Sequence, residues 1–136
     1  MFAALALAFL GYFVTDAPVA ARDSNSVIQV MLAELGQRRP ENCPGRWCAC
    51  YLDNALARAG LSPHGTNLAS DFADYGAPAE PGQIGAIMVM SNHVGVVVGT
   101  CENGQVQIVS GNYSNRVALG CYSASRAIAW RAPLGA

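Results

Sequence analysis

Three polar residues have the types and spacing that covalent chemistry needs: Cys48, His93 and Asn112. Cys48 follows the loop at residues 44–47 and is predicted to lie in the first turn of a helix. Free backbone N–H groups and the helix dipole favour a thiolate there. A thiolate is a nucleophile, and His93 can serve it as general base. The pattern predicts catalysis by a thiol; the alternative is a buried cysteine that only begins the apolar stripe of its helix.

The position of Asn112 depends on the register of one predicted hairpin. A neutral imidazole needs its second nitrogen held, because that bond fixes the tautomer. If residues 103–104 form a two-residue turn, His93 lies opposite Ser114 and Asn112 is its diagonal neighbour. A turn one residue earlier places Asn112 directly opposite His93, and a three-residue loop with a bulge shifts the register by one. We expect Asn112 to orient the imidazole.

The cysteine count indicates one free thiol in an oxidised protein. The five cysteines are Cys43, Cys48, Cys50, Cys101 and Cys121. With Cys48 free, four remain and allow three pairings, of which we favour Cys101–Cys121 and Cys43–Cys50. The first would join a hairpin tip to a later strand, and the second would tie a loop to a helix. The spacing is a poor zinc framework, so we expect neither a metal nor another cofactor.

The N-terminal segment has the pattern of a signal peptide. Residues 2–14 are apolar or small, and residues 17–21 offer the small side chains that signal peptidases accept. We therefore expect a signal peptide at residues 1–21, a single catalytic domain at 22–136, and a secreted or periplasmic protein. A buried N-terminal helix or an uncleaved anchor is the alternative.

Composition excludes several classes of protein. The chain has 136 residues, 52% hydrophobic and 12% charged, which excludes intrinsic disorder. A formal net charge of -1 without a basic stripe argues against nucleic acid as a partner. No apolar run reaches the roughly 18–20 residues of a membrane-spanning helix.

Periodicity predicts helices first and strands afterwards, which is typical of an α+β domain. Ser26 is expected to cap the first helix, which Gly36 ends. The other expected helices are 47–59 and 67–75, and the five expected strands are 84–90, 94–99, 105–110, 117–122 and 127–131.

Four blocks resemble the NlpC/P60- and CHAP-type cell-wall hydrolases. Residues 47–60 are similar to the nucleophile helix, 81–85 to a Pro-Gly-Asp-Ile strand entry, 93–99 to the histidine strand, and 111–117 to the Gly-Asn block of a small-amidase subgroup, with 131–133 as the closing strand. The chain departs from the family pattern at Cys50, Gln83 and Asn92.

The resemblance implies a papain-like α+β fold, with N-terminal helices packed on a five-stranded, mostly antiparallel sheet. It implies that Cys48 is the nucleophile, His93 the base and Asn112 the third polar residue in the cleavage of peptidoglycan amide bonds. The backbone N–H of Cys48 is the expected oxyanion donor. Asn42 is a candidate second donor, and Trp47 is expected to contribute to substrate binding.

Peptidoglycan is the expected partner of a monomer, and an inhibitor or immunity protein is a further candidate. Endopeptidase and amidase cleavage both stay open. One alternative function is a secreted, disulfide-stapled binding module without catalysis. Another is an acyltransferase or a toxin with the same fold, because a thioester can pass its acyl group to an amine.

Overall fold

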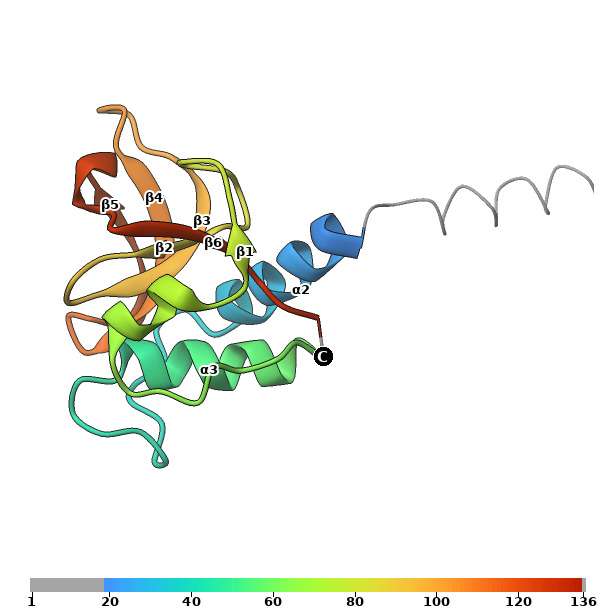
Figure 1. Ribbon diagram of the computed structural model, residues 1–136. Coiled ribbons are helices and arrows are strands. Elements are labelled where there is room, and N and C mark those ends of the chain that lie inside the picture. The colour runs from blue at the N-terminus through green and yellow to red at the C-terminus, as the bar shows by residue number, and fades with distance from the viewer. Residues whose placement is uncertain (1–18, 136) are drawn as a thin grey trace, which may run out of the picture.

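The computed structural model describes residues 19–135, in which helical elements precede an antiparallel sheet (Figure 1). The helical elements are α2 (Val19–Ala33), α3 (Cys48–Arg58) and the 3-10 turns η1 (Ala69–Asp74) and η2 (Ala124–Arg126). The strands are β1 (Ala77–Pro78), β2 (Ile87–Val89), β3 (Val94–Thr100), β4 (Val106–Tyr113), β5 (Arg116–Tyr122) and β6 (Ala129–Ala132). The predicted α+β class is confirmed.

The sheet has six strands in the order β1-β6-β2-β3-β4-β5, so the expectation of five was wrong. The additional strand is β1, which pairs Ala77 with Ala132 and Pro78 with Arg131. Two residues carry no periodicity, which is why the pattern gave no sign of them. Proline suits this position because an edge strand needs no N–H on its open side.

Side chains of the central strands alternate between two apolar clusters, as the pleat of a sheet requires. Ile87 and Val89 face the cluster formed with the helices, whereas Met88 belongs to a second cluster with Trp130. Helix α3 contacts β3 and β4, and α2 contacts α3 and β4. In Figure 1, α3 lies below the strands of the sheet, and α2 lies above and to the right of α3.

Two helix predictions need correction. Helix α2 begins at Val19, so Ser26 lies inside it and is not its N-cap; its hydroxyl donates to the carbonyl of Ala59 at 3.3 Å. Residues 69–74 form a 3-10 helix, shorter than the predicted helix at 67–75. The predicted signal peptide lies almost wholly outside the described residues, and cleavage after Ala21 would fall within the first turn of α2.

Strand β4 is irregular where it approaches the predicted site. Its pairing with β5 shifts between Ser110 and Tyr113, and Asn112 has a φ of 57° in the left-handed region. Ser114 and Asn115 also have positive φ angles and form the two-residue turn into β5. Asn112 therefore does not follow the regular alternation of the strand.

Both favoured disulfides are present. Cys43 is bonded to Cys50, and Cys101 to Cys121, with Cα separations of 5.7 and 6.2 Å. Cys48 is free and buried. Among the described residues, no helix has the length and apolar character needed to cross a membrane.

Candidate active site

Cys48 is the first residue of α3 and is 6% exposed. The first helical hydrogen bond runs from Tyr51 N–H to the carbonyl of Trp47 at 2.8 Å, so the backbone N–H of Cys48 has no helical acceptor. Cys48 lines a space of about 260 Å³. This thiol pocket is lined by Arg46, Cys48, Asn92, His93 and Asn112. The fold thus brings Cys48, His93 and Asn112 to one pocket from three separate elements.

The imidazole of His93 is held on one edge and one face. Its Nε2 lies 2.8 Å from the hydroxyl oxygen of Ser110, which is fully buried. The ring stacks on Tyr122 with 5.6 Å between centroids, and the Arg126 guanidinium lies 5.2 Å from the centre of the same tyrosine ring. Because Ser110 is hydrogen-bonded to Nε2, Nδ1 is the ring nitrogen that remains for proton transfer.

Burial keeps the imidazole uncharged at neutral pH. Removal of water from the ring, and secondly the positive charge of Arg126, lower the pKa of His93 from 6.5 to about 4. A neutral imidazole has a free nitrogen lone pair, which a general base requires.

The thiol is also kept in its neutral form. Burial raises the pKa of Cys48, although hydrogen bonding from the backbone of Val94, Ala49 and Cys48 itself acts in the opposite direction. The helix start thus favours the thiolate, as predicted from the sequence, but desolvation is the larger effect. The expectation of an ionised sulfur in the free protein needs correction for this reason.

Asn112 lines the thiol pocket, but the residue that shares a hydrogen bond with the His93 ring is Ser110. The hairpin has the three-residue loop with a bulge, because Thr100 pairs with Val106 and the register shifts by one between Val97 and Gly99. Beyond this shift Val96 pairs with Val109, and the same register continued along the strands places His93 opposite Asn112. The left-handed backbone of Asn112 then turns its side chain out of the strand pattern, whereas Ser110 precedes the irregularity and keeps its inward position.

Asn42 and Trp47 lie away from the pocket opening. The amide of Asn42 makes two reciprocal hydrogen bonds of 3.0 Å with the amide of Asn54, and Asn42 does not line the thiol pocket. Trp47 is 1% exposed and packs edge-on against Tyr51 at 5.9 Å. Asn42 thus ties the loop before α3 to the helix, and Trp47 anchors the start of the helix in the core.

Ser110 and Arg46 are the site residues that sequence reasoning missed. Ser110 is fully buried, and no other serine, threonine, amide or charged side chain of the described residues is buried. A lone serine in an apolar strand, two residues before Asn112, was the available signal. Arg46 directly precedes Trp47, and its position two residues before the nucleophile was the signal there.

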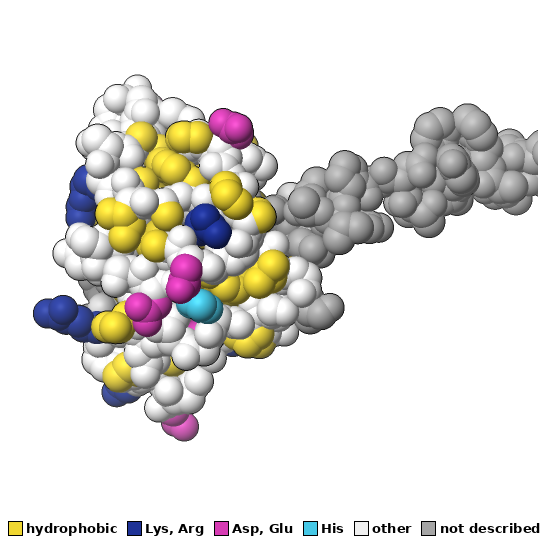
Figure 2. All heavy atoms as spheres, in the orientation of Figure 1, with side chains coloured by type: hydrophobic (Ala, Val, Ile, Leu, Met, Phe, Trp, Pro, Cys, Tyr) yellow, Lys and Arg dark blue, Asp and Glu magenta, His cyan; other side chains and the backbone are white. Residues whose placement is uncertain are grey.

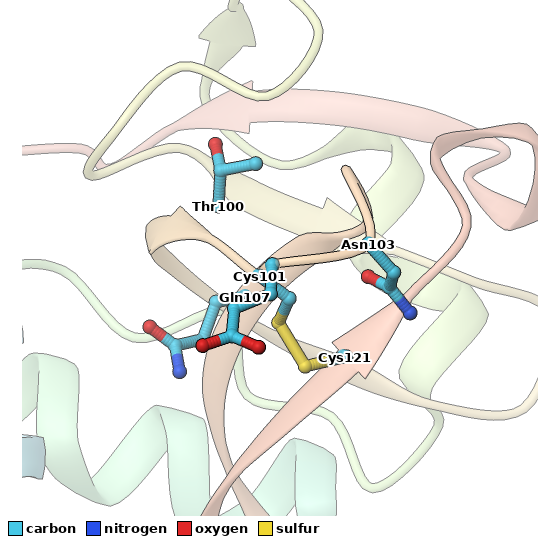
Figure 3. Close-up of a pocket in the computed structure, with 6 residues that line it drawn as sticks. Thr100, Cys101, Asn103, Gln107 and Cys121 are labelled. Atoms are coloured by element: carbon cyan, nitrogen blue, oxygen red, sulfur yellow. A yellow bond between two sulfur atoms is a disulfide. The ribbon is translucent and has the colours of Figure 1, made fainter.

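A larger space of about 510 Å³ lies at the β3–β4 hairpin tip (Figure 3). Its lining includes both cysteines of the Cys101–Cys121 disulfide together with Thr100, Asn103 and Gln107. Sulfur atoms joined to each other offer no free thiol, and no histidine lines this space. The chemistry therefore points to the smaller thiol pocket.

Charged side chains are scattered over the face drawn in Figure 2, where hydrophobic side chains gather over the strands. No basic stripe crosses that face. This distribution agrees with the nearly balanced charge of the sequence.

Neither a family model nor a curated protein sequence matches the chain. Among solved structures, the P60 domain of antigen MAP1204 from M. avium subspecies paratuberculosis is similar, with a TM-score of 0.54 and 16% sequence identity. The match covers 87% of this chain and 96% of the P60 domain. The chain therefore has a P60-like fold, in which N-terminal helices pack on an antiparallel sheet.

Proposed function

We propose that this protein is a cysteine hydrolase that cleaves amide bonds in peptidoglycan. The observation that carries the proposal is the shared pocket of Cys48, at a helix start, and His93, whose Nε2 is held by a buried serine. The P60-like fold supports peptidoglycan as the substrate class.

In the proposed mechanism, His93 acts as base and then as acid. With Nε2–H donating to Ser110, Nδ1 takes the thiol proton as the Cys48 sulfur attacks the amide carbonyl carbon. The negative charge that forms on the carbonyl oxygen accepts a hydrogen bond from the Cys48 backbone N–H. The C–N bond then breaks, and the imidazolium gives its proton to the leaving amine.

Water completes the cycle. His93 removes a proton from water as the oxygen attacks the thioester carbon, and the carboxylic acid product leaves. The proton returns to the sulfur and restores the neutral thiol. Each turnover thus consumes one water and releases one amine and one carboxylic acid, with no change of oxidation state.

Digestion of purified sacculi tests the function. The full chain should release fragments whose mass spectra show the gain of one water at a cleaved amide bond, and the identity of that bond distinguishes endopeptidase from amidase. Cys48→Ala should abolish release while circular dichroism shows an intact fold. Continued cleavage by Cys48→Ala would end the proposal, and products joined to an added amine would favour the acyltransferase alternative.

The two disulfides support an oxidising location, and we propose that the protein is secreted or periplasmic after removal of residues 1–21. The non-catalytic binding module predicts a protein that retains peptidoglycan without changing it. Sacculi incubated with the wild-type chain would then bind protein and release no fragments.

A further inference from the structure

Cys48 also lines a second space, beside the thiol pocket. This side pocket has a volume of about 130 Å³ and is lined by Arg46, Cys48, Asn67, Leu68, Ala69, Ser70, Ser91 and Asn92. Three of these residues, Arg46, Cys48 and Asn92, also line the thiol pocket. Cys48 therefore lies where two spaces adjoin, as a nucleophile must if substrate extends on both sides of the attacked bond.

The charge of this double pocket is one-sided. Its lining contains amides, hydroxyls, apolar side chains and His93, but neither aspartate nor glutamate. Arg46 is the one permanently charged side chain in either lining. The Arg126 guanidinium adds a second positive charge close enough to act on His93. A ligand in the double pocket thus meets positive charge without a competing carboxylate of the protein.

Arg46 has no hydrogen-bonding or ion-pairing partner among the described residues. Arg58 pairs with Glu34 at 2.7 Å, and Arg131 donates to the carbonyls of Tyr75 and Gly76, whereas Arg38 has no such partner in the described part of the chain and lies outside both pockets. The guanidinium of Arg46 keeps its donors for a ligand, two residues from the nucleophile.

We infer that Arg46 binds a free carboxylate of the substrate next to the scissile amide, so that the site selects acidic peptides over their amidated forms. This inference rests on the proposed function. A guanidinium suits the role because its planar donors match both oxygens of a carboxylate, and such charge-assisted pairs are roughly twice as strong as neutral hydrogen bonds.

Paired substrates test the inference. Muropeptides from digested sacculi are compared with the same muropeptides after carbodiimide amidation of their carboxylates. Arg46→Gln should raise KM for the free acids about tenfold or more and leave kcat within about twofold, with little effect on the amidated set. Arg46→Lys should fall between, because an ammonium keeps the charge but loses the paired geometry.

Arg38→Gln is the matched control, because Arg38 is exposed and lines neither pocket. It should leave both substrates unchanged. An equal loss on both substrates with Arg46→Gln, or no loss on either, would overturn the inference.

Binding separates this inference from the proposed function. Calorimetric titration of the Cys48→Ala chain with the two muropeptide sets needs no catalysis. Tighter binding of the free acids, lost in the Cys48→Ala/Arg46→Gln double variant, supports carboxylate recognition even if the wild-type chain cleaves nothing. Equal binding of acid and amide rejects it even if hydrolysis is established.

Discussion

The protonation states of Cys48 and His93 decide how the proposed chemistry can begin. Both shifts have burial as their largest cause, and both favour the neutral group, with a raised thiol pKa and an imidazole pKa of about 4. The proton must then move from sulfur to nitrogen as the substrate is attacked. A thiolate–imidazolium pair between Cys48 and His93 is therefore not required before the substrate binds.

The lowered pKa of His93 predicts that stability falls in mild acid. Between pH 6.5 and about 4 the unfolded chain binds a proton that the folded ring does not, so the free energy of unfolding decreases as pH falls through that window. The full effect is about 3 kcal/mol, at ~1.4 kcal/mol for each pKa unit. Denaturant titrations of wild type and His93→Gln at several pH values measure it as the difference between the two curves.

His93→Gln removes the titrating ring and keeps an amide that can bond to Ser110. Its stability should therefore be flatter over the same pH range. Parallel curves for the two proteins would show that His93 is not buried in its neutral form.

The hydrogen bond between Ser110 and His93 leads to a second prediction, on kcat. Ser110→Ala should lower kcat about tenfold to a hundredfold with little change in KM, because the ring loses the partner that fixes its tautomer. Imidazole nitrogen NMR shifts of His93 should change with the variant, which a purely structural role for Ser110 does not require. Kinetics on soluble muropeptides give the two constants.

Asn112→Gly is the matched comparison, since glycine accepts the φ of 57° and removes only the amide. A large loss of kcat in Asn112→Gly with none in Ser110→Ala would restore Asn112 as the orienting residue.

At the scale of elements, hydrophobic periodicity predicted the regular helix well but did not predict where a strand is interrupted. The stripe from Cys48 to Ala59 gave α3 nearly to the residue, because one face of that helix is buried along its whole length. The apolar run at 84–90 predicts one strand, but the strand spans only Ile87–Val89 and Ile84 is 61% exposed. Apolar composition alone does not show where pairing begins.

The limits of sequence patterns also explain why Asn112 was predicted as the partner of the His93 ring, whereas Ser110 is the residue hydrogen-bonded to it. Pairing across a regular hairpin points to Asn112, and a shift within β4 gives the ring to the residue before the irregularity. A bulge follows from the whole packing of β4 and β5, and no local sequence rule fixes its place.

Helix α3 positions Cys48 only if it can approach β4 closely, which predicts the effect of Gly111→Ala. A Cβ at Gly111 would lie 2.8 Å from the Tyr51 side chain, which is buried and bonded to Glu34. We expect a loss of about 1–3 kcal/mol in the free energy of unfolding and reduced activity. Thermal and chemical denaturation measure the first effect, and sacculus digestion the second.

Gly45→Ala is the control, because a Cβ at Gly45 meets nothing within 4 Å. It should be nearly neutral in both assays. A harmless Gly111→Ala would show that α3 can move away from the sheet without cost.

In the whole molecule, the site joins one end of α3, the start of β3 and the end of β4, which lie far apart in the chain. Sequence reasoning reached this assembly through residue chemistry and resemblance, since spacing alone does not bring distant elements together. The two disulfides constrain different parts of the molecule. Cys43–Cys50 encloses the start of α3, whereas Cys101–Cys121 ties the distal hairpin to β5.

The two disulfides should therefore separate stability from activity. From loop-closure entropy, Cys43–Cys50, with a sequence separation of 7, should add about 2 kcal/mol to the free energy of unfolding. Cys101–Cys121, with a separation of 20, should add about 3 kcal/mol. Cys101→Ser/Cys121→Ser should lose more stability and keep most activity below its melting temperature. Cys43→Ser/Cys50→Ser should lose less stability and more activity, because the segment carrying Arg46 and Cys48 is released. Denaturant midpoints and initial rates on sacculi, measured on both double variants, test this reversal; the same ranking in both assays would mean that the bond around α3 does not position the thiol.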